Sequence, residues 1–300
     1  MRRFCTDILL FCLFLAALTA VAGGAYRLKL GLLRLPPGTT TLICGDSHGQ
    51  TALSDRVMPG AANCCQSAEH LLYTEQKLRL LLPGNPGVRT VLLVLSYHSF
   101  SAMYDRYILS SPLTDVMYPQ FFMMLDPAAQ WFIARRDPRG LRRAMPAIVG
   151  ENASTVTAWR LSGYPFWGGY YDSDRSRLSD AVVAATIERH YYEGGAAQGF
   201  ARYQAPYLER IVRLCAEHHV QLVLVSTPLS PQYLARVPRK FIDHYDSTVA
   251  ALAGMGVELL DYHDLNVPMD WYGDGDHLNA RGAGSFTRRV MAALQRPGGE

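Results

Sequence analysis

Residues 39–50 read TTTLICGDSHGQ, and this stretch decides the predicted fold. Its first part, Thr39–Cys44, is rich in β-branched and apolar side chains and ends at a glycine, which predicts a short buried strand. A helix is expected from about Thr51. Between the two, Gly45 permits a tight turn that would expose the hydroxyl of Ser47 beside its own backbone N–H and the start of the helix. The stretch therefore predicts a serine nucleophile at the end of the first strand.

Three more apolar runs have the length of buried strands: Val91–Leu95, Val220–Val225 and Val257–Leu260. Segments with helical spacing alternate with them, namely Glu69–Leu82, Tyr207–His219, Phe241–Met255 and Ala280–Gln295. Strands that alternate with helices are typical of a parallel sheet covered on both faces. We therefore predict an α/β fold with a doubly wound, mostly parallel sheet of five strands.

A second polar motif, DGDHLN at Asp274–Asn279, lies between the last predicted strand and the last predicted helix. His277 would act as a general base, and Asp274, three residues earlier, could accept the other ring N–H and fix the tautomer. With that spacing, Asp276 is expected to point elsewhere and to cap the helix. Ligands of open α/β sheets bind at the carboxyl ends of the strands, so we expect Ser47 and His277 to meet there.

The N-terminus carries most of the positive charge. The chain has a net charge of +3, yet residues 1–34 hold five basic residues and one acidic residue (5 − 1 = +4), which leaves about −1 for the rest and speaks against nucleic acid as a partner. Ile8–Ala25 is free of charge and follows Arg2 and Arg3. This pattern predicts a single membrane helix with the domain outside the cytoplasm, and a cleaved signal peptide is the alternative. The predicted division is an anchor or signal segment at 1–28, a linker at 29–38 and a domain at 39–297.

Residues 100–200 break the alternation of strands and helices, and we interpret them as a largely helical insertion that covers the site. They contain a cluster of arginines and the aromatic loop Tyr164–Tyr171, in which Trp167 and Tyr170 could stack on a substrate. Ordinary packing and a solvated helix face are the alternatives for these two features. No cysteine or histidine pair has the spacing of a zinc site, and no phosphate-binding glycine motif occurs, so we predict no metal and no cofactor.

The motifs around Ser47 and His277 resemble those of the SGNH/GDSL hydrolase family over roughly residues 40–100 and 205–297. The resemblance implies a flavodoxin-like SGNH fold, with Ser47 as nucleophile, His277 as base and Asp274 as the orienting acid. The family's Gly-x-Asn-Asp block, whose Asn donates to the oxyanion, is replaced by Ser96-Tyr97-His98-Ser99 after the second apolar run. His98, or backbone N–H groups with a residue near Asn63 to Ser67, would then supply the oxyanion donors, and His48 could line the site.

Together with the N-terminal segment, these departures are similar to a membrane-anchored branch of the family that includes the teichoic acid D-alanyl transfer protein and alginate O-acetyltransferases. That resemblance implies acyl transfer, with acetyl as the expected group, to an exported or cell-envelope polysaccharide outside the cytoplasm. It also implies a membrane-bound O-acyltransferase as partner and a glycan as acceptor. Two alternatives remain open: an esterase or deacetylase that hydrolyses acyl esters of glycan or lipid, and a non-catalytic scaffold in an export complex.

Overall fold

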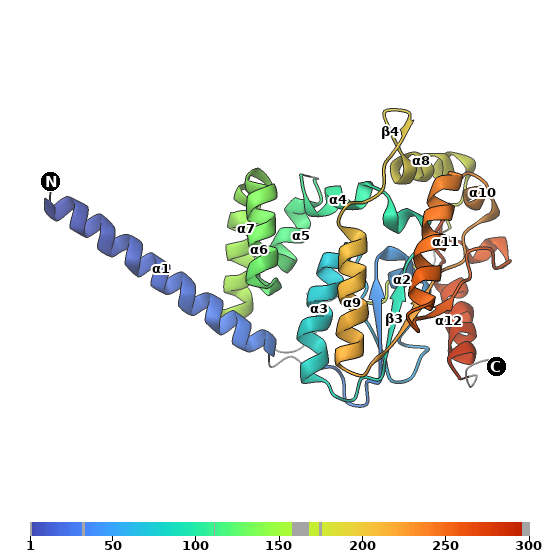
Figure 1. Ribbon diagram of the computed structural model, residues 1–300, viewed down its shortest axis with the longest axis horizontal. Coiled ribbons are helices and arrows are strands. Elements are labelled where there is room, and N and C mark those ends of the chain that lie inside the picture. The colour runs from blue at the N-terminus through green and yellow to red at the C-terminus, as the bar shows by residue number, and fades with distance from the viewer. Residues whose placement is uncertain (1, 32–33, 111, 158–167, 174–175, 296–300) are drawn as a thin grey trace.

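A five-stranded, all-parallel sheet forms the centre of the protein in the computed structural model, which describes residues 2–31, 34–110, 112–157, 168–173 and 176–295 (Figure 1). Across the sheet the strands follow the order β2-β1-β3-β6-β7. Their bounds are β1 Thr41–Gly45, β2 Ala61–Asn63, β3 Thr90–Val94, β6 Gln221–Val225 and β7 Glu258–Leu260. In chain order this is 2-1-3-4-5, so the direction of winding reverses between β1 and β3, where ligands of such sheets bind.

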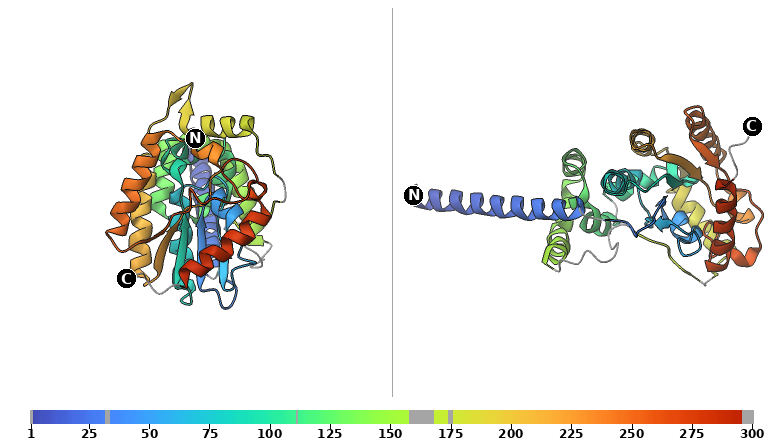
Figure 2. Two further views of the ribbon diagram at one scale, coloured as in Figure 1. Left: turned by 90° about the vertical axis from the view of Figure 1, so that its right-hand side faces the viewer. Right: turned by 90° about the horizontal axis from the view of Figure 1, so that it is seen from below.

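Helices cover both faces of the sheet (Figure 2). They are α2 (Ser47–Ala52), α3 (Leu71–Gly84), α9 (Gln204–Glu217), α11 (Arg239–Ala253) and α12 (Ala280–Leu294). Successive strand residues point to opposite faces: in β1, Leu42 and Cys44 pack in the cluster with α3, α9 and α11, whereas Ile43 packs in the cluster with α2 and α12. This alternation confirms the predicted doubly wound α/β sheet.

The four predicted strands all belong to the sheet, and the fifth is β2, whose short sequence has no apolar run. The helix expected from about Thr51 begins earlier, at Ser47, because the Asp46 carboxylate accepts a hydrogen bond from the backbone N–H of His48 and caps it. Four cysteines, Cys44, Cys64, Cys65 and Cys215, are buried with free thiols.

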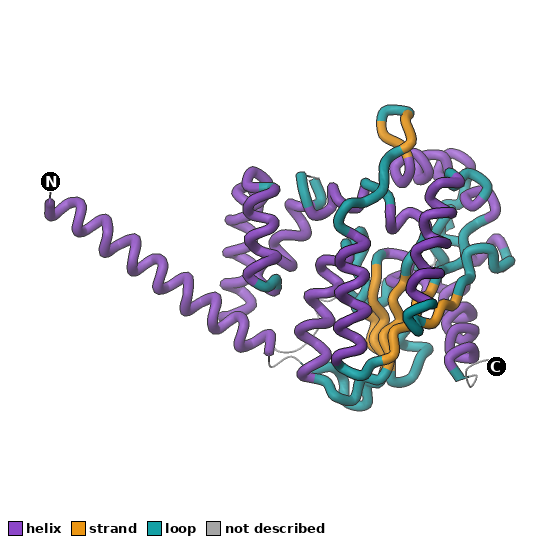
Figure 3. The backbone as a smooth tube through the Cα atoms, viewed as in Figure 1, coloured by secondary structure: helices purple, strands orange, loops and turns teal. Residues whose placement is uncertain are grey.

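The segment between β3 and α9 is helical, as predicted (Figure 3). Its elements are η1 (Tyr97–Phe100), α4 (Met103–Ile108), α5 (Thr114–Phe121), η2 (Phe122–Met124), α6 (Pro127–Arg136), α7 (Pro138–Thr157) and α8 (Asp180–Tyr191). A small hairpin of β4 (Tyr192–Glu193) and β5 (Ala196–Ala197) follows α8. Two short helices lie nearer the C-terminus, α10 (Pro231–Leu234) and η3 (Met269–Trp271).

The N-terminal helix α1 (Arg2–Gly31) projects from the rest of the protein, and its C-terminal part contacts α7 and η2 (Figure 1). It extends through residue 28 into the predicted linker. Among the helices of the described residues, none has the combination of length and apolar character that a bilayer crossing requires.

Candidate active site

Ser47 is the first residue of α2 and follows directly on the turn that ends β1. Gly45, the last residue of the strand, has φ = 135°, a conformation that side chains with a Cβ rarely adopt. A Cβ at this position would also lie 2.7 Å from the carbonyl oxygen of Val94 in β3. Glycine therefore lets the chain turn sharply against the neighbouring strand and present Ser47 at the carboxyl edge of the sheet.

His277 reaches Ser47 from the loop between β7 and α12. Its Nε2 lies 2.8 Å from the Ser47 Oγ, and its Nδ1 lies 3.0 Å from Oδ1 of Asp274. The backbone N–H of His277 also donates to Asp274 Oδ1, at 2.9 Å, so the aspartate holds the loop as well as the ring. The structure thus brings the three predicted catalytic residues into one hydrogen-bonded chain with the geometry of a nucleophile, a base and an orienting acid.

Asp276 lies elsewhere than the sequence analysis expected. It is 1% exposed, with one carboxylate oxygen 3.4 Å from Nδ1 of His277 and the other 3.3 Å from Nε2 of His48. The predicted cap of the last helix is supplied by Asn279, whose side chain accepts from the N–H of Gly282. The prediction for Asp276 was wrong because both aspartates of the motif face Nδ1 of His277, which leaves the cap to Asn279.

Beneath His277 lie three buried histidines whose rings follow one another in a row, His48, His98 and His190, which we call the histidine stack; the last two rings are stacked, with 15° between their planes, and the others are tilted. Ring centroids are 4.6 Å apart for His277 and His48, 4.3 Å for His48 and His98, and 4.5 Å for His98 and His190. Sequence reasoning did not find His190, since it lies on α8 of the insertion and has no motif around it.

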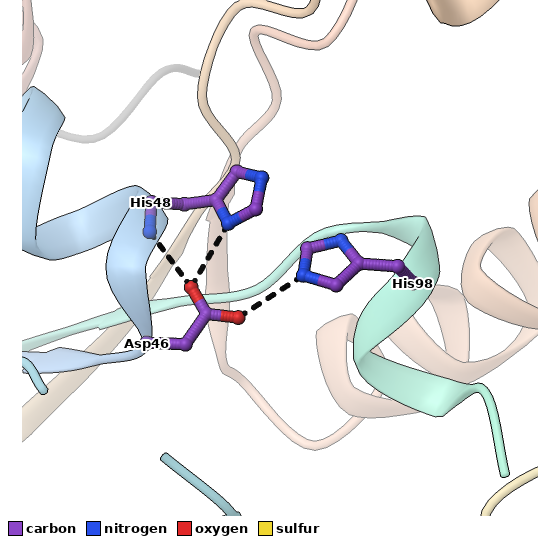
Figure 4. Close-up of side chains that lie close together, drawn as sticks. All are labelled: Asp46, His48 and His98. Atoms are coloured by element: carbon purple, nitrogen blue, oxygen red, sulfur yellow. Dashed lines mark hydrogen bonds and ion pairs between the residues drawn. The ribbon is translucent and has the colours of Figure 1, made fainter. Parts of the chain in front are cut away.

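Asp46 bridges the first two rings of the histidine stack. Figure 4 shows one carboxylate oxygen toward Nδ1 of His48, at 3.1 Å, and the other toward Nε2 of His98, at 3.2 Å. The hydroxyl of Tyr104 also donates to Asp46. Both oxygens of the Asp46 carboxylate therefore have partners: the backbone N–H and Nδ1 of His48 on one oxygen, and His98 and Tyr104 on the other.

The pKa values follow from burial opposed by these contacts. Burial alone would raise the pKa of Asp46 and Asp276, but the neighbouring histidines hold the pKa of both carboxyls well below the usual range. Burial alone would lower the pKa of His48 and His277, yet the adjoining carboxylates raise the pKa of both rings, that of His277 strongly. For His98 and His190 burial prevails, and their pKa is lowered. Within the histidine stack, the contacts with carboxylates therefore favour the charged form of His48, and burial favours the neutral forms of His98 and His190.

A cavity of about 470 Å³ opens over the hydroxyl of Ser47. Its wall consists mostly of polar residues: Ser47, Gln50, Thr51, Ser67, Tyr171, Ser173, Arg177, Gly273, Asp274, His277 and Leu278. Ser67 donates to the side-chain oxygen of Gln50, at 2.6 Å, which fixes that amide at the rim. The candidate catalytic groups thus face a space large enough for a sugar residue or an acyl ester.

The part of the insertion that precedes α8 forms one side of this cavity; we call residues 168–173 with Arg177 the strap. The N–H of Gly169 donates to the carbonyl of Cys65, and the N–H of Tyr171 donates to that of Gln50 at the end of α2. The N–H of Arg177 donates to the carbonyl of Gly273, beside the aspartate and histidine motif. The strap is therefore hydrogen-bonded to the α2 side of the candidate site and also to the loop that carries Asp274 and His277.

Two predicted oxyanion residues lie away from the cavity. The amide of Asn63 donates to the carbonyls of Gly49 and Leu53 and accepts from the N–H of Cys65, so it is used to hold the loops behind α2. His98 binds Asp46 within the histidine stack, and His48 is buried beneath His277. Asn63, His98 and His48 are therefore not among the residues that line the cavity, and the identity of the oxyanion donors stays a prediction.

The other predicted binding residues differ in their placement. Ser67 lines the cavity, whereas Tyr170 lies beside Arg56, whose guanidinium carbon is 5.6 Å from the ring centroid. Trp167 lies outside the described residues, so the prediction for it has no outcome. Tyr171, which the sequence analysis did not single out, is the aromatic residue of the strap that lines the cavity.

Two groups of side chains have ligand atoms within 4.8 Å of one another, a spacing that one metal ion could bridge: Asp46, His48 and His98, and His48, Asp276 and His277. The same atoms already face one another as carboxylate oxygens and ring nitrogens at 3.1–3.4 Å. We therefore describe both groups as parts of a hydrogen-bonded and ion-paired network.

Comparison with protein-family models found no family that matches this chain, and comparison with curated proteins found no match either. The functional argument consequently depends on the geometry of the site.

Proposed function

We propose that the protein catalyses serine-dependent acyl chemistry through Ser47, His277 and Asp274, in the manner of SGNH hydrolases. The observation that carries the proposal is the contact between Ser47 Oγ and His277 Nε2 at 2.8 Å, with Asp274 on the far side of the ring. The strand order 2-1-3-4-5, with the site at the carboxyl edge, supports a flavodoxin-like SGNH fold.

In the first half of the proposed reaction, Ser47 Oγ attacks the carbonyl carbon of an acyl donor while its proton passes to Nε2 of His277. Asp274 keeps the ring oriented and stabilises its positive charge. We propose that the tetrahedral oxyanion accepts hydrogen bonds from the backbone N–H of Ser47 and from the side chains of Gln50 and Arg177, three residues that line the cavity. The intermediate collapses when the donor's alcohol oxygen leaves with the proton from His277, and an acyl ester remains on Ser47.

In the second half, a hydroxyl group of the acceptor gives its proton to His277 and attacks the acyl carbon. Ser47 then leaves and recovers the proton. We propose that the acceptor is a sugar hydroxyl of an exported or cell-envelope polysaccharide and that the acyl group is acetyl. The polar wall of the cavity and the aromatic ring of Tyr171 beside it suit a carbohydrate.

Hydrolysis is the second candidate function, and a specific observation favours it. Tyr171 on the strap is 59% exposed, so water has a route to the same cavity. Water in place of the sugar hydroxyl would make the protein an esterase or deacetylase with identical first-half chemistry.

Labelling of Ser47 by a fluorophosphonate probe tests the shared chemistry. We expect the wild type to be labelled and Ser47→Ala to remain unlabelled, while His277→Ala slows labelling by several orders of magnitude and Asp274→Ala by less. Asp264→Asn, an exposed aspartate outside the site, is the matched control and should label as the wild type does. Labelling that persists in Ser47→Ala would contradict the assignment.

Measurement of ester-linked acyl groups on envelope polysaccharide separates the functions. A deletion strain that loses these esters, and regains them with the wild type but not with Ser47→Ala, supports transfer. A gain of esters in the deletion supports hydrolysis. Full complementation by Ser47→Ala would favour a non-catalytic scaffold in an export complex.

We also propose that α1 holds the domain at a membrane, outside the cytoplasm, near a membrane-bound O-acyltransferase that supplies the acyl group. Described side chains of α1 such as Phe4, Leu9 and Phe14 are exposed. The insertion also exposes Trp131 of α6 and five arginines of α6 and α7, namely Arg135, Arg136, Arg139, Arg142 and Arg143. Exposed tryptophan and arginine side chains on one part of a protein suit a surface that meets anionic lipid headgroups.

Flotation of the full chain with vesicles tests this placement. We expect flotation with vesicles that contain phosphatidylglycerol, and weaker flotation when Arg139 and Arg142 are both changed to glutamine. Recovery of a mature N-terminus at Gly23 from cells would replace the anchor with a cleaved signal peptide.

A further inference from the structure

The candidate base has two carboxylates at the same ring nitrogen. Asp274 Oδ1 lies 3.0 Å from Nδ1 of His277 and Asp276 Oδ1 lies 3.4 Å from it. The two differ in their surroundings, because the Asp274 side chain is 32% exposed and the Asp276 side chain 1%. A charge screened by little water acts more strongly on its neighbour than an exposed charge at a similar distance.

Asp276 is held in place by histidines instead of backbone donors. Its Oδ2 lies 3.3 Å from Nε2 of His48 and 3.8 Å from Nδ1 of His190. Neither of its oxygens has a hydrogen bond of good geometry among the described residues. A buried carboxylate with so few hydrogen bonds needs neighbouring positive charge to stay ionised. The nearest groups that can supply it are the rings of His48 and His277.

We propose that Asp276 is a second positioning residue of the triad, which shares with Asp274 the orientation of His277 and stabilises its protonated form, and that His48 moderates this effect from the opposite side of the carboxylate. The inference rests on the proposed function, since it assigns Asp276 a part in the action of the same base. Through the triad, the histidine stack then governs the pH at which Ser47 can be activated.

Among the described residues, titratable and charged groups of six elements face this arrangement. They are Asp274 and Asp276 before α12, Asp46 and His48 at the start of α2, His98 in η1, Tyr104 in α4, Arg189 and His190 in α8, and Tyr233 in α10. Beyond His190 the row ends at Tyr233, whose hydroxyl lies 2.7 Å from the His190 Nδ1. His48 is the ring best placed to oppose Asp276 with a positive charge, because it lies between two buried carboxylates, with Nδ1 3.1 Å from Asp46 Oδ1 and Nε2 3.3 Å from Asp276 Oδ2. These carboxylates raise the pKa of His48, whereas burial lowers the pKa of His98 and His190.

The two halves of the proposal predict shifts of opposite sign. Asp276→Asn removes a negative charge beside His277, so the pKa of His277 should fall. His48→Gln removes a positive charge that opposes the same carboxylate, so the pKa of His277 should rise. We expect about one pKa unit or more for Asp276→Asn, a tenfold change in the fraction of free base at a given pH below the pKa.

The experiment measures the rate of fluorophosphonate labelling of Ser47 against pH in the detergent-solubilised full chain, for wild type, Asp276→Asn and His48→Gln. The acidic limb of the rate profile should move to lower pH in the first variant and to higher pH in the second. Asp264→Asn and His218→Gln, which lie outside the network, serve as charge-matched controls and should leave the limb in place. A purely structural role for Asp276 would reduce the fraction of labelled protein at every pH without a shift of the limb, and that result overturns the proposal.

Titration of the histidine ring protons by NMR provides a readout that needs no catalysis, with the His277 signal assigned by its loss in His277→Gln. A lower pKa of His277 in Asp276→Asn and a higher one in His48→Gln would support the pairing of Asp276 with His277 even if Ser47 cannot be labelled. Such pKa changes without labelling would contradict only the proposed function. Unchanged His277 titration in both variants refutes the inference, whatever the labelling shows. If Asp276→Asn fails to fold, an unchanged or lowered pKa of His277 in His48→Gln refutes it alone.

Discussion

Replacement of Gly45 by alanine tests whether the turn before Ser47 needs glycine for the two reasons that the structure gives. The first reason is the backbone, since φ = 135° lies in the region that residues with a Cβ rarely adopt. The second is space, because the new Cβ would lie 2.7 Å from the Val94 carbonyl oxygen and 3.1 Å from the Val94 Cβ. Gly45 and Val94 are paired residues of β1 and β3, so neither strand can yield without disturbing the sheet.

Two other glycines separate these contributions. Gly256 has φ = 82° and no atom within 4 Å of an added Cβ, so Gly256→Ala carries the backbone strain alone, about 1–2 kcal/mol. Gly49 lies in α2, where its added Cβ would meet the Cys65 Sγ at 2.5 Å and the Val94 Cγ2 at 2.9 Å, so Gly49→Ala carries overlap alone, about 1–3 kcal/mol. Gly45→Ala combines both effects, and we expect a loss of about 2–5 kcal/mol in the free energy of unfolding.

Guanidinium unfolding of the four proteins in detergent measures these losses, and fluorophosphonate labelling reports the site. We expect Gly45→Ala to label at least tenfold more slowly than Gly256→Ala, because a shift of β1 moves Ser47 away from His277. A loss of stability in Gly45→Ala no larger than in Gly256→Ala would refute the argument from close approach. Normal labelling would show that the turn does not control the position of Ser47.

Three further predictions concern the charged groups of the site. Because the pKa of His277 is raised well above the 6.5 of a free imidazole, labelling of Ser47 should increase with pH through an acidic limb above 6.5, and a limb at or below 6.5 would contradict the contacts described. The raised pKa of His277 also stabilises the folded state. This stabilisation is complete below pH 6.5 and is lost as the pH rises through the pKa of the folded protein. In urea titrations between these pH values, the wild type should therefore lose more stability than His277→Gln. Tyr104→Phe leaves the buried Asp46 with one donor fewer, which should cost about 1–3 kcal/mol in thermal or chemical unfolding, and a loss below 0.5 kcal/mol would show that this hydroxyl is replaceable.

The sequence predicted those parts of the fold that depend on local pattern. Runs such as Val91–Leu95 are apolar throughout because both faces of a central parallel strand are buried, and this made β3 and its neighbours recognisable. Strand β2 was missed because an edge strand of three residues, Ala61–Asn63, requires no apolar run. The positions of Ser47 and His277 followed from a general rule about strand ends, which does not depend on the details of the insertion.

The interior of the site could not be predicted in the same way. Asp276 was assigned to the wrong role because the direction of a side chain in a turn depends on the turn's own geometry, which spacing does not specify. His190 belongs to the site only because α8 folds back over the ends of the strands. Asn63 was a reasonable candidate by type, yet its amide satisfies backbone groups that only the folded loops bring together.

The four buried thiols can report when the folded protein opens, because they react only once they are exposed. Burial raises the pKa of the Cys64 and Cys215 thiols to about 12, and those of Cys44 and Cys65 are raised as well, so almost no reactive thiolate exists in the folded state. Alkylation of these residues therefore requires that the sheet and its helices separate first. Cys65 packs with α2 and α12 beside the strap, whereas Cys64 and Cys215 pack in the cluster with α3 and α9, so residue-resolved alkylation would time the exposure of the two faces of the sheet separately.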